Sequence, residues 1–237
     1  MPVHTIPVVG RPFARFAGQV GGLTADAALA GLQDGSISGT VVLRPGQGLT
    51  EDEWNAISAA AAAEARREPV LAEAGLYKRD PRNILIGDLE QVAWRHWRAV
   101  LAVHADNAVL ADHDNATAHI PGMVEVEACA QMAMAATEQY LVPSSGDHVF
   151  TTKRLDIEFT TFLFPLAATV ELRADRADWP RPEVLAADFT ATIVQAGLTV
   201  AVMRFQARVF ERGFFDRLES ERARDAVAAR PDLLEQR

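Results

Sequence analysis

The sequence predicts an α+β domain in which a twisted antiparallel sheet wraps around one central apolar helix, with an N-terminal extension. Residues 124–141 predict the helix, because they contain neither Gly nor Pro and are dominated by Ala and Met. The sheet is predicted by segments after residue 150 in which apolar and polar residues alternate. A sheet with one apolar face needs a cover, so we expect it to enclose this helix, the only long apolar one.

Residues 1–70 are expected to form the extension, whose role the sequence does not define. Thr24–Leu32 has the pattern of a helix, and Gly39–Leu43 has that of a strand. Thr50 followed three residues later by Glu53 is a capping box, which should open an alanine-rich helix. The extension would either cap the helix side of the sheet or be the remnant of a second unit.

The main domain is expected at residues 71–213. The loop at residues 76–83 should lead into a strand at Ile84–Ile86, and Trp94–Asp112 fits a strand or hairpin with a turn at Asp106-Asn107. After a break at residues 144–146, strands are expected at KRLDIEF (153–159), LAATVELRA (166–174), Asp188–Val194 and Leu198–Phe210. Residues 214–237 are predicted to form a charged helix or tail.

Composition excludes several classes of function. The net charge of −9 argues against nucleic acid as the main partner, since phosphate contacts need clustered Lys and Arg. The single cysteine, Cys129, allows no intrachain disulfide and suggests a reducing compartment. We see no signal peptide, and residues 124–141 are too short and too rich in carboxylates to span a membrane. A cytoplasmic protein without membrane association is therefore expected.

Candidate site residues gather where the apolar helix begins. Pro121-Gly122 marks its start, and the loop ahead of it supplies two imidazoles, His113 and His119. On the helix, Glu127 and Gln131 share one face. A carboxylate on an apolar helix must be paired, hydrated or functional, so Glu127 is either a catalytic acid or a structural carboxylate.

Two segments resemble a known family. LYKRDPRNILIGD (76–88) resembles the opening motif of the A-factor biosynthesis hotdog domain, and AHIPGMVEVEACAQ (118–131) resembles the start of that domain's helix. The resemblance spans roughly residues 76–210 and implies a hotdog fold. It also implies transfer of a β-ketoacyl group to dihydroxyacetone phosphate. Members of this family usually have Arg three residues after the acid, however, where this chain has Ala130, and often contain two hotdog units, where only one is recognisable here.

The same helix also resembles that of 3-hydroxyacyl thioester dehydratases. In those enzymes a His lies eight residues before Pro-Gly and a Glu six residues after that Pro, as His113 and Glu127 do around Pro121-Gly122. Elimination of water would use His113 as the base and Glu127 as the acid, because an apolar setting favours a protonated carboxyl. Gln131 would orient Glu127.

Substrate binding would involve the helix start and nearby cations. The amides around Gly122 and Met123 would face the thioester carbonyl at a helix N-terminus, where partial positive charge favours an oxyanion. His119 is a second candidate catalytic imidazole, although it and His113 could also be ordinary loop histidines. Asp112, His113, Asp114 and His119 lack regular ligand spacing, so neither a metal nor a cofactor is expected.

The leading hypothesis is therefore dehydratase-like elimination from an acyl thioester of acyl carrier protein or coenzyme A. Acyl transfer would need an anion pocket, for which the candidates are Lys153 and Arg154, with Lys78, Arg79 and Arg82, unless these are only solubilising charges. A thioesterase, or a non-catalytic acyl-binding or dimer-partner subunit, remains open. A single unit leaves open sheet edges, so we expect a homodimer.

Overall fold

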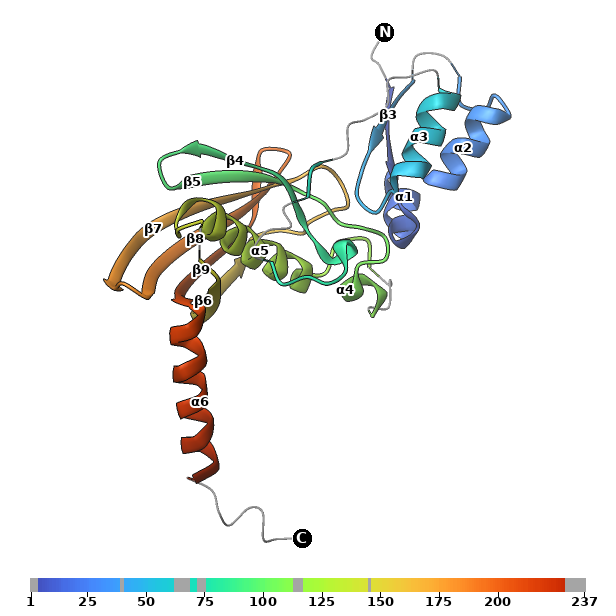
Figure 1. Cartoon of the computed structure of the whole chain (residues 1–237). Helices are drawn as coiled ribbons and strands as arrows, with labels where there is room; N and C mark the ends of the chain where they lie inside the picture. The colour runs from blue at the N-terminus through green and yellow to red at the C-terminus, as the bar shows by residue number, and fades with distance from the viewer. Residues whose placement is uncertain are drawn as a thin grey trace, which may run out of the picture.

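The computed structural model describes residues 4–38, 41–61, 69–71, 76–112, 117–144 and 146–228. These residues form two sheets, a small parallel one near the N-terminus and a large antiparallel one that follows it (Figure 1). The strand order is β2-β1-β3 in the first and β4-β5-β7-β8-β9-β6 in the second.

The N-terminal unit is a small α/β structure. Its elements are β1 (His4–Val9), η1 (Arg11–Phe13), α1 (Ala14–Val20), β2 (Leu23–Thr24), α2 (Ala25–Gln33), β3 (Val41–Pro45) and α3 (Glu51–Ala60). The expected helix at Thr24–Leu32 is confirmed as α2, and the expected strand is confirmed as β3, although residues 39–40 lie outside the described residues. The capping box is also confirmed, because Glu53 N donates to Thr50 Oγ1 at 3.2 Å and Thr50 N donates to Glu53 Oε2 at 2.7 Å.

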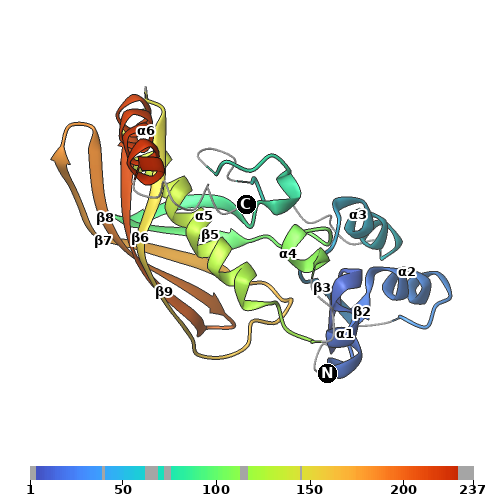
Figure 2. The same ribbon diagram turned by 90° about the horizontal axis from the view of Figure 1, so that it is seen from below.

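Strand β1 runs parallel to both β2 and β3. The described part of the extension is therefore unlike a second antiparallel unit. It also does not cover the central helix. Both views place it beside the end of the large sheet where that helix begins (Figure 2).

The large sheet is antiparallel throughout. Its strands are β4 (Ile86–Ala93), β5 (His96–Leu101), β6 (His148–Phe159), β7 (Thr169–Arg181), β8 (Val184–Gln195) and β9 (Leu198–Glu211). The four strands expected after residue 150 are confirmed as β6 to β9. Between β8 and β9, Ala196 and Gly197 both have positive φ, which suits a two-residue hairpin turn.

The prediction for Trp94–Asp112 is confirmed in part. The hairpin turn lies at Trp94-Arg95, between β4 and β5, and Arg95 takes a left-handed φ of 54°. A turn does lie at the predicted place, since Asn107 N donates to His104 O at 3.1 Å, but it leads into the short helix α4 (Ala108–Ala111) and does not join two strands. The Asn107 side chain accepts a hydrogen bond from Val109 N at 3.0 Å. The expected strand at Ile84–Ile86 starts only at Ile86.

Helix α5 (Gly122–Tyr140) is the predicted central helix, and the large sheet curves around it (Figure 2). Cys129, Met132, Ala133 and Ala136 are fully buried, which joins the helix to the apolar face of the sheet. The helix is not buried all round, however. Met123 is exposed and Glu127 is partly exposed on one face.

The chain continues from β9 directly into α6 (Arg212–Ala228), which projects away from the sheet (Figure 1). None of its side chains is buried, and the expectation of a charged helix is confirmed for the described residues. Of the helices in the described part of the chain, none combines the length and apolarity needed to cross a membrane.

Candidate functional site

The site is built where the two sequence motifs meet. Lys78, in the loop before β4, places its Nζ 2.5 Å from Glu127 Oε1 on α5. Gln131, one helical turn further on, donates a hydrogen bond from Nε2 to the same oxygen at 3.0 Å. The side chains of Lys78 and Glu127 are 28% and 33% exposed, so the pair is open to solvent on one side.

Gln131 fixes the loop to the helix. Its side chain is completely buried, its Oε1 accepts a hydrogen bond from Leu85 N at 2.8 Å, and its Nε2 also donates to Asn83 O at 2.8 Å. One amide therefore satisfies two main-chain groups of the loop and also contacts Glu127. The contact that the sequence suggested between Gln131 and Glu127 is present.

Contacts on both sides hold Lys78 in place. The Tyr77 hydroxyl donates to the His148 carbonyl at the start of β6, at 2.5 Å. On the other side, Asp80 caps the 3₁₀ helix η2 (Pro81–Asn83) by accepting from Arg82 N at 3.0 Å. The loop is thus attached to β6 and ordered by its own cap.

The setting of Glu127 differs from the expected apolar one, because an ammonium group and an amide face it. The buried acid of α5 is Glu125, which is 3% exposed and whose Oε2 has no hydrogen-bond partner. Burial raises the pKa of Glu125 to about 7. The two acids lie two residues apart and therefore on opposite sides of the helix, but the sequence does not reveal which side is buried.

Within the described residues, no hydrogen bond or ion pair joins His119 to Glu127. His113 lies outside them, as does Asp114, so their positions are not described. His119 is half-buried, and its ring lies against that of Phe162 with centroids 4.6 Å apart. Among the described residues there is no group of three His, Cys, Asp or Glu side chains that could hold a metal ion.

The start of α5 is held closely by its surroundings. Ile120 N donates to Leu163 O at 2.8 Å, which fixes the chain just before Pro121. A Cβ atom on Gly122 would lie 2.9 Å from the Phe159 ring, so only glycine fits there without displacing that ring. Pro121 is the N-cap and offers no side-chain cap, and Val124 N donates to Pro121 O at 2.9 Å. The amides of Gly122 and Met123 are the ones that could meet a ligand.

The family of this chain follows from a match to a family model. The model of the A-factor biosynthesis hotdog domain matches residues 62–211, which is more than half of the chain. The chain belongs to this hotdog family. The match includes both motifs of the site, whereas the N-terminal unit lies outside it.

The hotdog domain is also similar to solved structures. The dehydratase heterocomplex ApeI:P from Xenorhabdus doucetiae has 14% identity and a TM-score of 0.47, over 65% of this chain and 98% of that one. A thioesterase from Haemophilus influenzae has 12% identity and a TM-score of 0.40, over 53% and 78%. A putative thioesterase from Ralstonia eutropha JMP134 has 14% identity and a TM-score of 0.38, over 51% and 82%. No curated protein matches the sequence.

The basic residues of the hotdog domain do not form one cluster. Arg82 is paired with Asp80 at 2.7 Å, and this bond raises the pKa of the Arg82 guanidinium. Lys153 and Arg154 are exposed on β6, where the pairing with β9 is interrupted by a register shift. Of the candidates for an anion pocket, only Lys78 contacts the acid in the described structure.

Proposed function

We propose that this hotdog domain is an enzyme that acts on an acyl thioester, and that Glu127 transfers the proton in its reaction. The observation that carries the proposal is the contact of Glu127 with Lys78 and Gln131, close to the start of α5. Met123 and Glu127 are four residues apart and therefore lie on one face of the helix. A thioester carbonyl bound at the first-turn amides would have its neighbouring carbons on the side of Glu127.

The first candidate reaction is elimination of water from a 3-hydroxyacyl thioester. In this reaction the α C–H and β C–O bonds break, a C=C bond forms, and the hydroxyl leaves as water after taking up a proton. Glu127 accepts hydrogen bonds from both neighbours, which supports the role of proton acceptor rather than the acid role expected from the sequence. His113 or the Lys78 ammonium would then protonate the leaving hydroxyl.

The second candidate is transfer of a β-ketoacyl group to dihydroxyacetone phosphate, which the family match favours. Here Glu127 would take the proton of the acceptor hydroxyl, an ester C–O bond would form, and the thioester C–S bond would break to release the thiol. Lys78 offers a cation beside the acid, and Arg79 next to it is exposed, so a phosphate could bind there.

One experiment separates these reactions. The protein is incubated with 3-hydroxyacyl and 3-ketoacyl thioesters of coenzyme A and of acyl carrier protein, with and without dihydroxyacetone phosphate, and the products are identified by mass. We expect an enoyl thioester if the reaction is elimination and a phosphorylated ester if it is transfer. Free acid would indicate a thioesterase and contradict both. Acyl-chain binding without any product would show a non-catalytic subunit.

We also propose a homodimer formed along β6. This strand pairs only with β9 among the described strands, and its Leu155 and Phe159 are exposed. Phe159 contacts Gly122, so a second copy on this edge would also cover the start of α5. Light scattering tests the mass in solution, and a dilute monomer with full activity would refute the dimer.

A further inference from the structure

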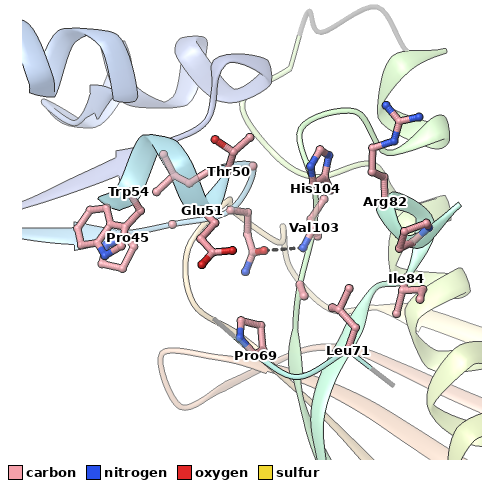
Figure 3. A pocket seen from close by; sticks show the side chains of 16 residues that line it. Pro45, Thr50, Glu51, Trp54, Pro69, Leu71, Arg82, Ile84, Val103 and His104 are labelled. Carbon is pink, nitrogen blue, oxygen red and sulfur yellow. Dashed lines mark hydrogen bonds between the residues drawn. The ribbon is translucent and has the colours of Figure 1, made fainter. Parts of the chain in front are cut away.

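The N-terminal unit is attached to the hotdog domain by a short segment, residues 45–48, which we name the hook. Its central residue, Gln47, is 7% exposed. The Gln47 side chain donates from Nε2 to Leu101 O at 3.1 Å and to Leu166 O at 3.2 Å. Its Oε1 accepts from Val103 N at 2.8 Å, which is the bond marked by the dashed line at Val103 in Figure 3. All three partners are main-chain groups of the hotdog domain.

The backbone of the hook adds further bonds. Gln47 N donates to Pro165 O at 2.9 Å, and Gly48 N donates to Val103 O at 2.8 Å. A Cβ atom on Gly46 would lie 2.3 Å from Pro165 O, so the hook approaches the loop closely only because this residue is glycine. The hook therefore fixes the loop at residues 160–167.

Around the hook, the junction is loosely filled. A cavity of about 460 Å³ lies between the two units, with Glu51 and Trp54 on one side and Arg82 and His104 on the other (Figure 3). A ring contact between Phe16 and Phe164, at 5.6 Å, is a second attachment. Val9, Phe13 and Ala17 of the N-terminal unit are buried in the same apolar cluster as the core of the hotdog domain, so the hydrogen bonds of the hook act beside an apolar contact between the units.

The loop that the hook fixes also reaches the start of α5. Gln195 of β8 holds the loop from the other side, since its Oε1 accepts from Phe164 N at 3.1 Å and its Nε2 donates to Phe164 O at 2.9 Å. Between these two attachments, Leu163 O accepts the hydrogen bond from Ile120 N. Two glutamines, one from each unit, therefore hold the loop to which the chain before α5 is bonded.

We propose that the N-terminal unit positions the start of α5, and that Gln47 is the positioning residue. Gln47 acts through Pro165 and Leu166 on Leu163, and Leu163 acts on Ile120 immediately before Pro121-Gly122. The effect on turnover rests on the proposed function, because it assumes that the first-turn amides bind the thioester carbonyl. The effect of Gln47 on how firmly Ile120 and the start of α5 are held does not depend on any reaction.

The test compares amide hydrogen exchange in the full chain and in its Gln47→Ala variant. We expect Ile120 N–H to exchange about tenfold faster in the variant, because the loop loses buried hydrogen bonds. Thr24→Ala is the matched control, since it removes the N-cap of α2 in the same unit, away from the hook, and should leave Ile120 unchanged. Unchanged protection of β8 and β9 shows that the hotdog domain stays folded.

Two further variants keep the test decisive if Gln47→Ala does not fold. Gln47→Glu keeps the acceptor for Val103 N but removes both donated bonds. Gly46→Ala keeps the Gln47 side chain chemically unchanged but pushes the hook away from Pro165 O. Unchanged exchange of Ile120 in the variants that fold would overturn the inference.

Turnover gives the second measurement. If the unaltered protein is active, kcat should fall about tenfold in Gln47→Ala with little change in KM, because oxyanion donors act in the transition state. Faster exchange with an unchanged kcat would overturn the positioning role. Faster exchange in a protein that has no turnover at all would support the inference and refute the proposed function instead.

Discussion

Lys78 Nζ lies 2.5 Å from Glu127 Oε1, so a loop and a helix that are distant in the sequence meet through opposite charges. Both side chains keep about a third of their surface exposed. Ion pairs in such settings contribute only about 0–1 kcal/mol to stability. The contact therefore matters more for the chemistry of Glu127 than for the folding of the domain.

Replacing Glu127 by Gln should abolish most of the activity while leaving the fold intact. The amide cannot accept a proton, so kcat should fall on the order of 10²–10⁴-fold. Initial rates on the thioester that the wild type converts provide the measurement. Glu138→Gln on the same helix is the control and should retain the wild-type rate. An active Glu127→Gln variant would remove this residue from the mechanism.

Replacing Lys78 by Met should lower the activity of the enzyme while leaving its stability almost unchanged. We expect kcat/KM to fall on the order of 10²-fold, because Glu127 loses its charged donor. The free energy of unfolding should change by less than about 1 kcal/mol. Lys78→Arg should recover part of the rate, and Arg79→Met should have little effect on elimination. A large loss of stability in Lys78→Met would show that the pair is structural.

Gln131→Leu should destabilise the protein. The substitution leaves Leu85 N–H and Asn83 C=O without their side-chain partner in a buried place, which costs about 3 kcal/mol. Urea unfolding followed by tryptophan fluorescence measures this change. Gln139→Leu is the matched control, because Gln139 is exposed near the end of the same helix. Equal midpoints for the two variants would contradict the assignment.

Glu125 should make stability depend on pH. Burial raises the pKa of the folded carboxyl from 4.5 to about 7, so the folded state binds the proton more tightly than the unfolded state. The contribution of Glu125 is therefore complete below about pH 4.5 and is lost as the pH rises to 7. The total loss is about 3 kcal/mol.

Glu125→Gln removes this titration. At pH 5 the variant and the wild type should have similar free energies of unfolding, whereas at pH 8 the variant should be more stable. Denaturant midpoints across this range give the difference directly. A difference that stays constant from pH 5 to pH 8 would show that Glu125 does not titrate as its burial implies.

Much of the large sheet and its helix could be predicted because the pattern of apolar residues in each element extends over many positions. Helix α5 and strands β6 to β9 each extend over ten residues or more, so their periodicity outweighs local exceptions. The hairpin between β4 and β5 could not be located, because its turn at Trp94-Arg95 contains no Gly, Asn or Asp. In the N-terminal unit, β2 has only two residues, which is too short for any pattern to show.

Part of the candidate site can be compared with the structure, whereas its catalytic role stays a prediction. Glu127, Gln131 and the basic loop were identified, and the structure brings them together. An apolar helix has no polar face to indicate orientation, so the sequence could not show that Glu125 rather than Glu127 faces the sheet. Lys78 was considered as an anion ligand or a solubilising charge and not as a partner of Glu127, since contacts between distant segments leave no spacing signal.

Gln131 also limits how this domain can change over evolutionary time. The amide supports the loop as well as the acid, so selection for folding alone would preserve it in a descendant that had lost its reaction. The presence of this amide in a related sequence would therefore indicate common ancestry and would not indicate activity. If the proposed function holds, substitutions at Glu127 and Lys78, which we expect the fold to tolerate, are the ones that would distinguish a working enzyme from an inactive copy.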